Sequence, residues 1–359
     1  MGSGTHAEET GRMMIGIERV LCTRNTCIDS YDVLAVIVNY NSKSFLRIEK
    51  KLLEGITKLS KFIKLKLLFI DNCSSDGSFK ELMEYGKMLC LDMEAVRLTK
   101  NFGFTRAVNI AWQYAHRRWN FRYLMLINND LVIIPRNVLR LLKYLEIDGV
   151  AGVQGTIMQA SNPSLIDNAG FAIDIFGLTY PICRGYTFYC AEFCCPSFLS
   201  GALSIYKAEA IEKLGQPFNN RVECYYDDKY LGLMLWSRGY KLLHIPLIVA
   251  YHLGSASYAD RNRFKSPQWF KGIVLADVAL TVSLRDPRRY IVMLYYGVAS
   301  MVLSLFTTSN YVKSFIAALK EAEILKQNIN LTRNIFGLVP KFKYIVKFNR
   351  LEKGIKIVK

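Results

Sequence analysis

Tyr123-Leu-Met-Leu-Ile-Asn-Asn-Asp130 is the stretch that decides how this chain folds. An apolar run ends there in two amides and a carboxylate, which is typical of a buried parallel strand that stops at its carboxyl end. Open α/β sheets bind ligands at that end, and a carboxylate there can hold a divalent cation against a diphosphate. Asn and Asp are also ordinary turn residues, so the rest of the chain must decide between the two readings.

Strand-like and helix-like segments alternate on both sides of this stretch. The alternation predicts an α/β fold, a Rossmann-like and mostly parallel sheet flanked by helices. Polar loops follow the strands at Asn39, Asp71, Asn101 and Asn128, and in a parallel sheet they lie along one edge and form a single ligand crevice. The expected strands are Val33–Asn39, Leu65–Ile70, Ala95–Leu98 and Tyr123–Ile127, and the expected helices are Phe45–Phe62, Phe79–Leu89 and Thr105–Trp119.

Composition narrows the partners but does not choose one. The 359 residues carry a net charge of +17, which fits nucleotides, phospholipid head groups or nucleic acid. The chain contains neither a P-loop nor a GxGxxG motif, which argues against NTPases and dinucleotide oxidoreductases. Cys183, Cys190, Cys194 and Cys195 form no CxxC pair, so a zinc ribbon is not expected. A disulfide, another metal site or buried thiols remain open for this cluster.

The chain becomes apolar and helical beyond Ser266. Tyr290–Phe306 is almost purely apolar but slightly shorter than the roughly 20 residues of a membrane-spanning helix. Residues 312–325 are amphipathic, and residues 341–359 alternate basic and apolar side chains. These segments predict helices that lie on or partly in a membrane surface, with a buried helical hairpin or an oligomer interface as the alternatives.

Several side chains at the predicted crevice have suitable chemistry for a nucleotide. The Asp71 carboxylate can accept a hydrogen bond from uracil, thymine or guanine, and Asn39 and Asn41 can close the same pocket. Gly103 lies where backbone passes close to a ligand, and Arg106 can pair with a diphosphate. Each residue also has an ordinary reading as a turn residue or an exposed side chain.

Two further sites lie in the second half of the chain. Asp227 and Asp228 stand at a helix start, where they can serve as a general base or simply cap the helix. Tyr225 and Tyr226 beside them can stack on a sugar ring. His252 follows a strand, and together with Asp130 it can form a metal site that a diphosphate completes.

The ordered set of motifs resembles the family 2 glycosyltransferases, in particular the rhamnosyltransferase-like branch. The resemblance covers about residues 33–257 and implies a GT-A fold. The expected organisation is an irregular tail at 1–32, a glycosyltransferase domain at 33–265 and a C-terminal helical region at 266–359, for which a membrane surface is one of the alternatives given above. The motifs are Val38–Asn41, Ile70–Ser78, Asn101–Phe104, Leu126–Asp130, Ser200–Ala202, Tyr226–Asp228 and His252.

The resemblance also implies roles for single residues. Asp228 is the expected catalytic base, with Asp227 in the first place of the family's acidic pair, and Asp130 and His252 are the expected ligands of Mg2+ or Mn2+. The chain departs from the family pattern at Asn128, where the metal-binding DxD motif begins with Asp, and at Tyr230, where relatives carry another Asp. The implied donor-binding residues are Asn39, Asn41, Asp71, Asn101, Gly103, Arg106, Asn128, Asn129 and Gly201.

The expected function is an inverting, metal-dependent hexosyltransferase of glycan or cell-surface polysaccharide synthesis. It would use a UDP-, GDP- or dTDP-sugar and a saccharide or lipid-linked acceptor. The expected location is peripheral, on the cytoplasmic face of a membrane, and a homo-oligomer is one option for the assembly. The alternative is a catalytically inactive nucleotide-sugar-binding or membrane scaffold protein, against which the intact Asp130, Asp228 and His252 argue. Nucleic acid is not an expected partner, because the motif loops hold few positive charges.

Overall fold

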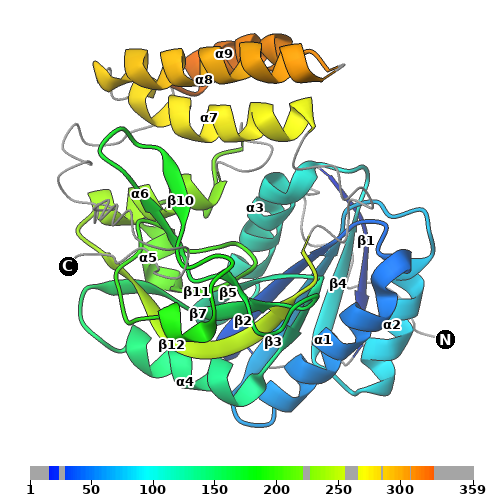
Figure 1. Cartoon of the computed structure of the whole chain (residues 1–359). Coiled ribbons are helices and arrows are strands. Elements are labelled where there is room, and N and C mark those ends of the chain that lie inside the picture. Colours follow the sequence, from blue (N-terminus) through cyan, green and yellow to red (C-terminus); the bar gives the residue numbers. More distant parts are fainter. Residues whose placement is uncertain are drawn as a thin grey trace.

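The molecule consists of a large α/β body and a layer of helices packed on top of it (Figure 1). The computed structural model describes residues 16–23, 29–220, 227–254, 266–283, 286–307 and 309–326. The predictions for Tyr225, Tyr226 and residues 341–359 therefore lie outside the described residues.

Within the described residues, ten strands form one sheet, in which β8 lies off the main path. The main order is β1-β4-β3-β2-β5-β11-β7-β12-β6, and the β2–β3, β3–β4, β2–β5 and β7–β12 pairs are parallel. This confirms the mostly parallel sheet expected from the sequence. The strands are β1 (Ile17–Cys22), β2 (Ser30–Asn39), β3 (Leu65–Asp71), β4 (Met93–Leu98), β5 (Asn120–Asn128), β6 (Leu131–Ile133), β7 (Val150–Gln159), β8 (Ile166–Asn168), β11 (Leu203–Lys207) and β12 (Lys241–His252).

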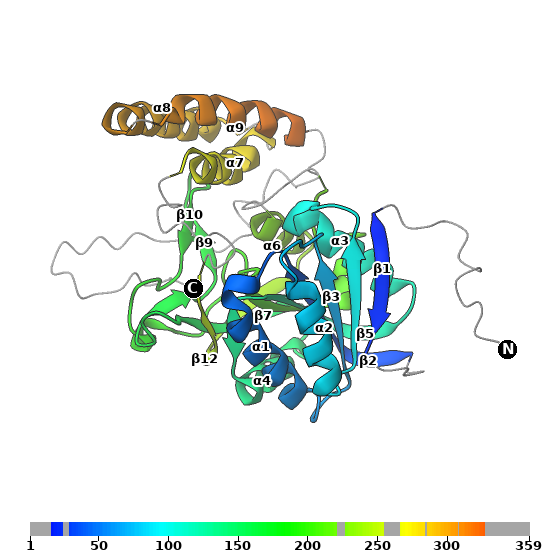
Figure 2. The same cartoon turned by 90° about the vertical axis from the view of Figure 1, so that its right-hand side faces the viewer.

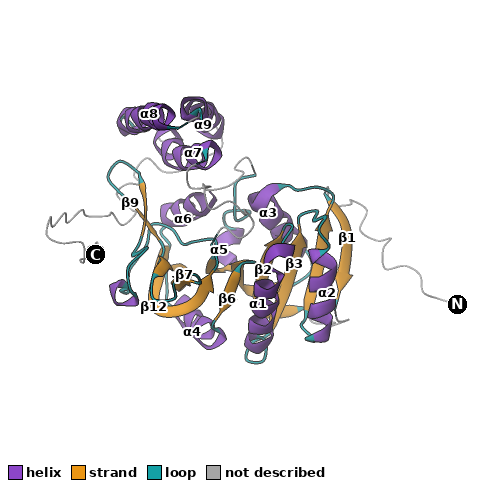
Figure 3. Ribbon diagram, turned by 45° about the vertical axis from the view of Figure 1, so that its right-hand side comes forward, coloured by secondary structure: helices purple, strands orange, loops and turns teal. Residues whose placement is uncertain are grey.

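Helices cover both faces of this sheet (Figure 3). Strand β2 shows why, because Val33, Ala35 and Ile37 pack against one helix layer while Leu34 and Val36 pack against the other. The first layer is α1 (Leu46–Leu59), α2 (Ser78–Met88) and α4 (Pro135–Leu145), and the second is α3 (Gly103–His116), α5 (Ala208–Glu212) and α6 (Asp227–Ser237).

The sequence predicted an irregular tail at 1–32, but part of this stretch is regular. Residues Ile17–Cys22 form strand β1, which pairs antiparallel with β4 at the edge of the sheet. Four of its six residues are exposed, so it lacks the apolar run by which the inner strands are recognised.

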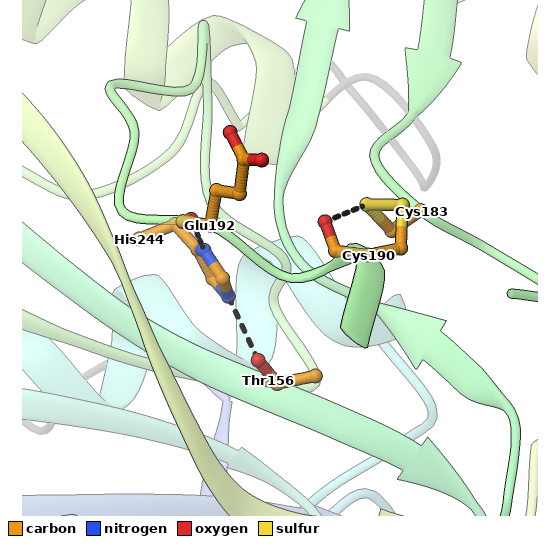
Figure 4. Close-up of a disulfide and its surroundings, with 5 residues drawn as sticks. All are labelled: Thr156, Cys183, Cys190, Glu192 and His244. Carbon is orange, nitrogen blue, oxygen red and sulfur yellow. Dashed lines mark hydrogen bonds between the residues drawn. A yellow bond between two sulfur atoms is a disulfide. The ribbon is translucent and has the colours of Figure 1, made fainter. Parts of the chain in front are cut away.

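A small hairpin rises from the body towards the C-terminal helices (Figure 2). It consists of β9 (Phe171–Ile173) and β10 (Thr179–Pro181). The cysteine-rich segment after it is tied by a disulfide between Cys183 and Cys190, which answers one question left open by the sequence (Figure 4). Near this segment, His244 bonds to Thr156 and to the carbonyl of Glu192.

The C-terminal helices form a separate apolar core above the body. They are α7 (Pro267–Ser283), α8 (Arg288–Phe306) and α9 (Tyr311–Lys326), called the helical layer below. Helix α7 lies next to the body, and α8 and α9 are outermost (Figures 1 and 2). Leu178 of the hairpin and Tyr230 of α6 pack against this core, so the layer is joined to the body by apolar contacts. Among the described helices, α8 alone is long and apolar enough to cross a membrane.

We expect Gly232→Ala in α6 to destabilise the protein. A Cβ atom at 232 would lie 2.3 Å from Cβ of Phe198 and 2.8 Å from the carbonyl oxygen of Ser197, so α6 would have to shift. Overpacking of this kind costs about 1–3 kcal/mol of unfolding free energy, which urea titration measures. Gly297→Ala in α8 is the matched control, because its nearest neighbour would be 3.6 Å away. Equal stability of the two variants would contradict the close packing of α6.

Candidate functional site

The carboxyl ends of β2 and β3 are joined by buried polar side chains. Asn39 is fully buried, and its amide nitrogen donates to Oδ1 of Asp71 at 2.9 Å and to the hydroxyls of Ser74 and Ser78. The side-chain oxygen of Asn41 accepts from the amide of Ser75 at 2.9 Å. The loop after β3 is therefore held against the end of β2, as the common edge of parallel strands requires.

Asp71 is the last residue of β3, at this edge of the sheet. Its side chain is fully buried, and Oδ2 accepts from Nη1 of Arg97 at 2.8 Å and from the amide of Ser74 at 3.0 Å. Because Oδ1 already accepts from Asn39, a nucleotide base could reach this carboxylate only as an additional donor. The geometry favours a role in shaping the crevice, through a pairing with Arg97 that the sequence analysis missed.

The loop after β4 is tied to the same place. Oδ1 of Asn101 accepts from the side chain of Asn72 at 2.7 Å and from the amide of Gly103 at 2.8 Å. Gly103 has φ +78°, a conformation that favours glycine. Arg106, the predicted diphosphate partner, instead donates from Nε to the carbonyl of Asn220 at 2.8 Å and remains largely exposed.

A line of charged side chains starts at the end of β5. Oδ1 of Asp130 lies 3.0 Å from Nε2 of His252, and Nδ1 of His252 lies 2.7 Å from Oδ2 of Asp167. Arg184 adds an ion pair to Asp167 at 3.6 Å. Burial lowers the pKa of His252, but its hydrogen bonds to Asp130 and Asp167 and their charges outweigh this effect and raise it to about 10.

Asp130 and His252 have the right atoms for a divalent cation. A metal-bound imidazole usually donates its second N–H to a carboxylate, and Asp167 is in place to accept it. Within the described residues, no cluster of three or more acidic, His or Cys side chains is suited to a metal. Asp130 and His252 would supply only two ligands, so a cation bound there would need further oxygen ligands.

The acidic pair at the start of α6 faces the loop before β11. Oδ2 of Asp228 accepts from the amide of Gly201 at 2.8 Å, and a Cβ at 201 would lie only 2.7 Å from Oδ1. Glycine at 201 thus permits this close approach. Burial and then the charge of Asp227 raise the pKa of Asp228 well above its usual range, against the effect of the Gly201 amide. Such a carboxylate binds a proton more tightly than an exposed one.

Backbone hydrogen bonds bring the two halves of the site together. The amide of Asn128 donates to the carbonyl of Ala202 at 2.8 Å, directly beside the Gly201 that holds Asp228. Asn129 is buried, and its amide nitrogen lies 3.3 Å from Oδ1 of Asn39. The crevice at the ends of β2 and β3, the Asp130–His252 pair and Asp228 therefore share one rim of the sheet.

Two buried residues near this rim were missed by the sequence analysis. Gln154 donates to Asn168 at 2.8 Å and accepts from the amide of Ser200 at 2.7 Å, so it fixes the loop that carries Gly201. Glu49 of α1 is fully buried, and this burial raises the pKa of its carboxyl group to about 8. The charges of Asp71 and Asp130 raise the pKa further, whereas the polar side chains of Ser42 and Asn129 lower it. Glu49 lies on the buried face of an ordinary amphipathic helix, so the pattern offers no signal for it.

Comparisons with known proteins agree with this architecture. A family model described as "Glycosyl transferase family 2" matches residues 34–215, about half of the chain. An uncharacterised protein of Methanocaldococcus jannaschii is 23% identical over 231 residues, which cover 64% of this chain and 93% of that protein.

Two solved structures are similar at low identity. S. aureus TarS 1-349 in complex with UDP-GlcNAc has a TM-score of 0.51 at 12% identity, covering 86% of this chain and 84% of that chain. GalNAc-T7 with UDP, GalNAc and Mn2+ has a TM-score of 0.50 at 16% identity, covering 70% of this chain and 51% of that chain. These likenesses confirm the expected fold.

We expect His252→Gln to remove one component of the pH dependence of stability in the metal-free protein. The folded pKa of about 10 exceeds the ordinary value of 6.5, so this stabilisation is complete below pH 6.5 and is lost as the pH rises towards 10. Urea unfolding of wild type and variant between about pH 7 and about pH 9 measures the difference.

His244→Gln is the matched control, with the opposite sign. Burial lowers the pKa of His244 to about 4, so its contribution is lost as the pH falls from 6.5 towards 4. If the stability difference between wild type and His252→Gln were the same at about pH 7 and at about pH 9, the His252 ion pairs would be refuted.

Proposed function

The chain belongs to glycosyl transferase family 2, and we propose that it is an inverting, metal-dependent hexosyltransferase that uses a nucleotide-sugar donor. The observation that carries the proposal is the position of Asp228. Its carboxylate has a raised pKa and is held by Gly201 on the same rim as the Asp130–His252 pair. The rhamnosyltransferase-like branch is part of the proposal and rests on the motifs.

The proposed reaction is a single displacement at the anomeric carbon. Asp228 takes the proton of the acceptor hydroxyl while that oxygen forms a bond to the anomeric carbon, and the bond from this carbon to the diphosphate breaks. Asp227 raises the basicity of Asp228 through its negative charge. Mg2+ or Mn2+, held by Asp130 and His252, would neutralise the charge of the departing nucleoside diphosphate.

The donor is proposed to lie along the edge formed by β2, β3, β4 and β5. Asn41, Asn101, Gly103, Asn128 and Asn129 would contribute amides and backbone groups to base, ribose and diphosphate. Asn39 and Asp71 support the pocket wall, because both are buried and paired within the protein. Arg106 is proposed to turn from the Asn220 carbonyl to the diphosphate when the donor binds.

Thermal-shift measurements with UDP, GDP and dTDP, each with and without Mn2+, test the donor class. We expect one nucleotide to raise the melting temperature, and to do so more strongly with Mn2+, because a ligand that binds only the folded state stabilises it. UDP is the first choice, since the TarS and GalNAc-T7 structures contain a uridine nucleotide. No stabilisation by any of the three would contradict a nucleotide-sugar enzyme.

The identified donor then tests the base. Asp228→Asn should bind nucleotide and Mn2+ as the wild type does but transfer sugar about 100- to 10,000-fold more slowly, because a general base contributes on that scale. Asp227→Asn is the control for its neighbour, and we expect a smaller loss because its role is electrostatic. Near-normal turnover of Asp228→Asn would show that Asp228 is not the base.

We further propose that the outer face of α8 lies in one leaflet of a membrane and that the acceptor is lipid-linked. This face is unusually apolar for an exposed surface, with Leu294 at 69%, Leu305 at 82% and Phe306 at 83% exposure. The opposite face packs through Val292 and Tyr296 into the helical layer. The large exposed apolar residues of α8 are Tyr290, Ile291, Leu294, Tyr295, Val298, Met301, Val302, Leu303, Leu305 and Phe306.

Charge and packing favour a leaflet over a second copy or a spanning helix. A groove of about 730 Å3 where α8 leads into α9 is lined by Lys313, Lys320 and hydroxyl side chains, and also by the apolar Val312, Ile316 and Ala317. This mixed lining suits a lipid with an anionic head group. Helix α8 packs on α7 and α9 through the strip Val292, Tyr296 and Ser300, and this strip is not available for lipid. The geometry therefore favours an in-plane, interfacial helix. The proposed location is the cytoplasmic face of that membrane.

Replacing Leu294 and Leu305 by Gln should weaken binding to vesicles that contain anionic phosphatidylglycerol. Each leucine should cost on the order of tenfold in the partition coefficient, because burying a leucine is worth about 1.5–3 kcal/mol. Cosedimentation measures the effect. Phe62→Gln is the control, since Phe62 is 71% exposed and follows α1, a helix of the body that lies away from α8 (Figure 1). Unchanged cosedimentation, or a wild-type dimer that the leucine changes dissociate, would refute the leaflet.

A further inference from the structure

The residue after the proposed base is a fully buried lysine. Lys229 follows Asp228 in the first turn of α6, and its side chain is 1% exposed. Its ammonium group donates to the carbonyl of Gly177 at 2.8 Å and to Oδ1 of Asp277 at 2.9 Å. A buried ammonium group is tolerated only when it is paired, so the start of α6 depends on these partners.

Asp277 accepts hydrogen bonds from two further elements. Its Oδ1 also accepts from the hydroxyl of Thr179 in β10 at 2.7 Å, and its Oδ2 accepts from the hydroxyl of Tyr296 in α8 at 2.5 Å. Asp277 itself belongs to α7 and is 2% exposed. The cluster therefore joins the hairpin, α6, α7 and α8 at one buried point.

We infer that Lys229, Asp277 and Tyr296, called the buried polar cluster below, position the catalytic helix by anchoring its first turn to the helical layer. This inference rests on the proposed function, because it concerns how Asp228 is held. All three residues lie beyond the stretch 34–215 that the family model matches. The helical layer would thus be part of the catalytic unit as well as a surface for lipid.

The geometry of α6 explains how the cluster reaches the base. Successive helix residues differ by about 100° and about 1.5 Å, so a rigid first turn fixes the direction of Asp228 once Lys229 is fixed. The side chain of Asp228 has little freedom, since its carboxylate accepts a hydrogen bond from the Gly201 amide at 2.8 Å. The carboxylate also leaves no space for a Cβ atom at position 201. A displacement of about 1 Å at a reacting group can reduce a rate about 100-fold.

The sharpest test compares a buried tyrosine with an exposed one. Tyr296→Phe removes the hydroxyl that bonds to Asp277, whereas Tyr189→Phe makes the same change on a residue that is 97% exposed and lies outside α8. We expect Tyr296→Phe to lower kcat by roughly 10- to 100-fold while the Kd for nucleotide and Mn2+ stays unchanged. Tyr189→Phe should match the wild type in both quantities.

A second set of variants tests the ion pair. Asp277→Asn and Lys229→Met should each lower kcat and speed hydrogen exchange of the α6 amides, while the amides of α3 remain protected. The double variant should be closer to the wild type than either single one, because it leaves no unpaired buried charge. A general loss of folding would instead affect α3, α6 and nucleotide binding alike.

Equal kcat and equal α6 exchange in Tyr296→Phe and Tyr189→Phe would overturn the inference, even if the ion-pair variants fail to fold. A double variant as impaired as the two single changes combined would also overturn it. Hydrogen exchange needs no substrate, so it separates this inference from the proposed function. A wild type that binds no nucleotide would refute the function, while exchange in α6 would still report whether the cluster anchors that helix.

Discussion

The structure depends on the pairing of polar groups that are buried at the carboxyl ends of the strands. A buried amide or carboxylate without a partner is costly, so each of these groups must meet another. Asn39 meets Asp71, Asp71 meets Arg97, and Asn72 meets Asn101. These contacts tie loops from separate strands into one edge, and the crevice is the surface that this edge leaves to a ligand.

The same requirement governs the second half of the chain, where the buried groups are charged. His252 lies between two carboxylates, and Lys229 lies against Asp277. The first set faces the leaving-group side of the proposed reaction, and the second anchors the helix that begins with the acidic pair. Breaking either pair would leave a charge in a poorly solvated place, which makes these positions sensitive to substitution.

The sequence was most informative where a local pattern reports a position in the sheet. Alternation of apolar strands and amphipathic helices, together with polar residues directly after each strand, was enough to predict the fold and the common edge. Strand β1 was missed because it is an exposed edge strand without an apolar run.

Long-range partners were missed for a different reason. Asp71 and Arg97 lie opposite each other on β3 and β4, and Asp167 meets His252 across 85 positions of sequence. No local pattern reports such contacts. Asp71 therefore read as a ligand contact from the sequence, although the fold gives it protein partners on both oxygens.

The order of these contacts along the chain has a consequence for biosynthesis. A ribosome releases the strands of the nucleotide crevice first, and their polar loops can pair among themselves as they emerge. Asp228 appears later, and Asp277 and Tyr296, the side chains that complete the anchor of its helix, come later still. An unfinished chain would thus present the edge proposed for the donor before the helix of the proposed base is anchored, and that anchor would be complete only after α8 had been made.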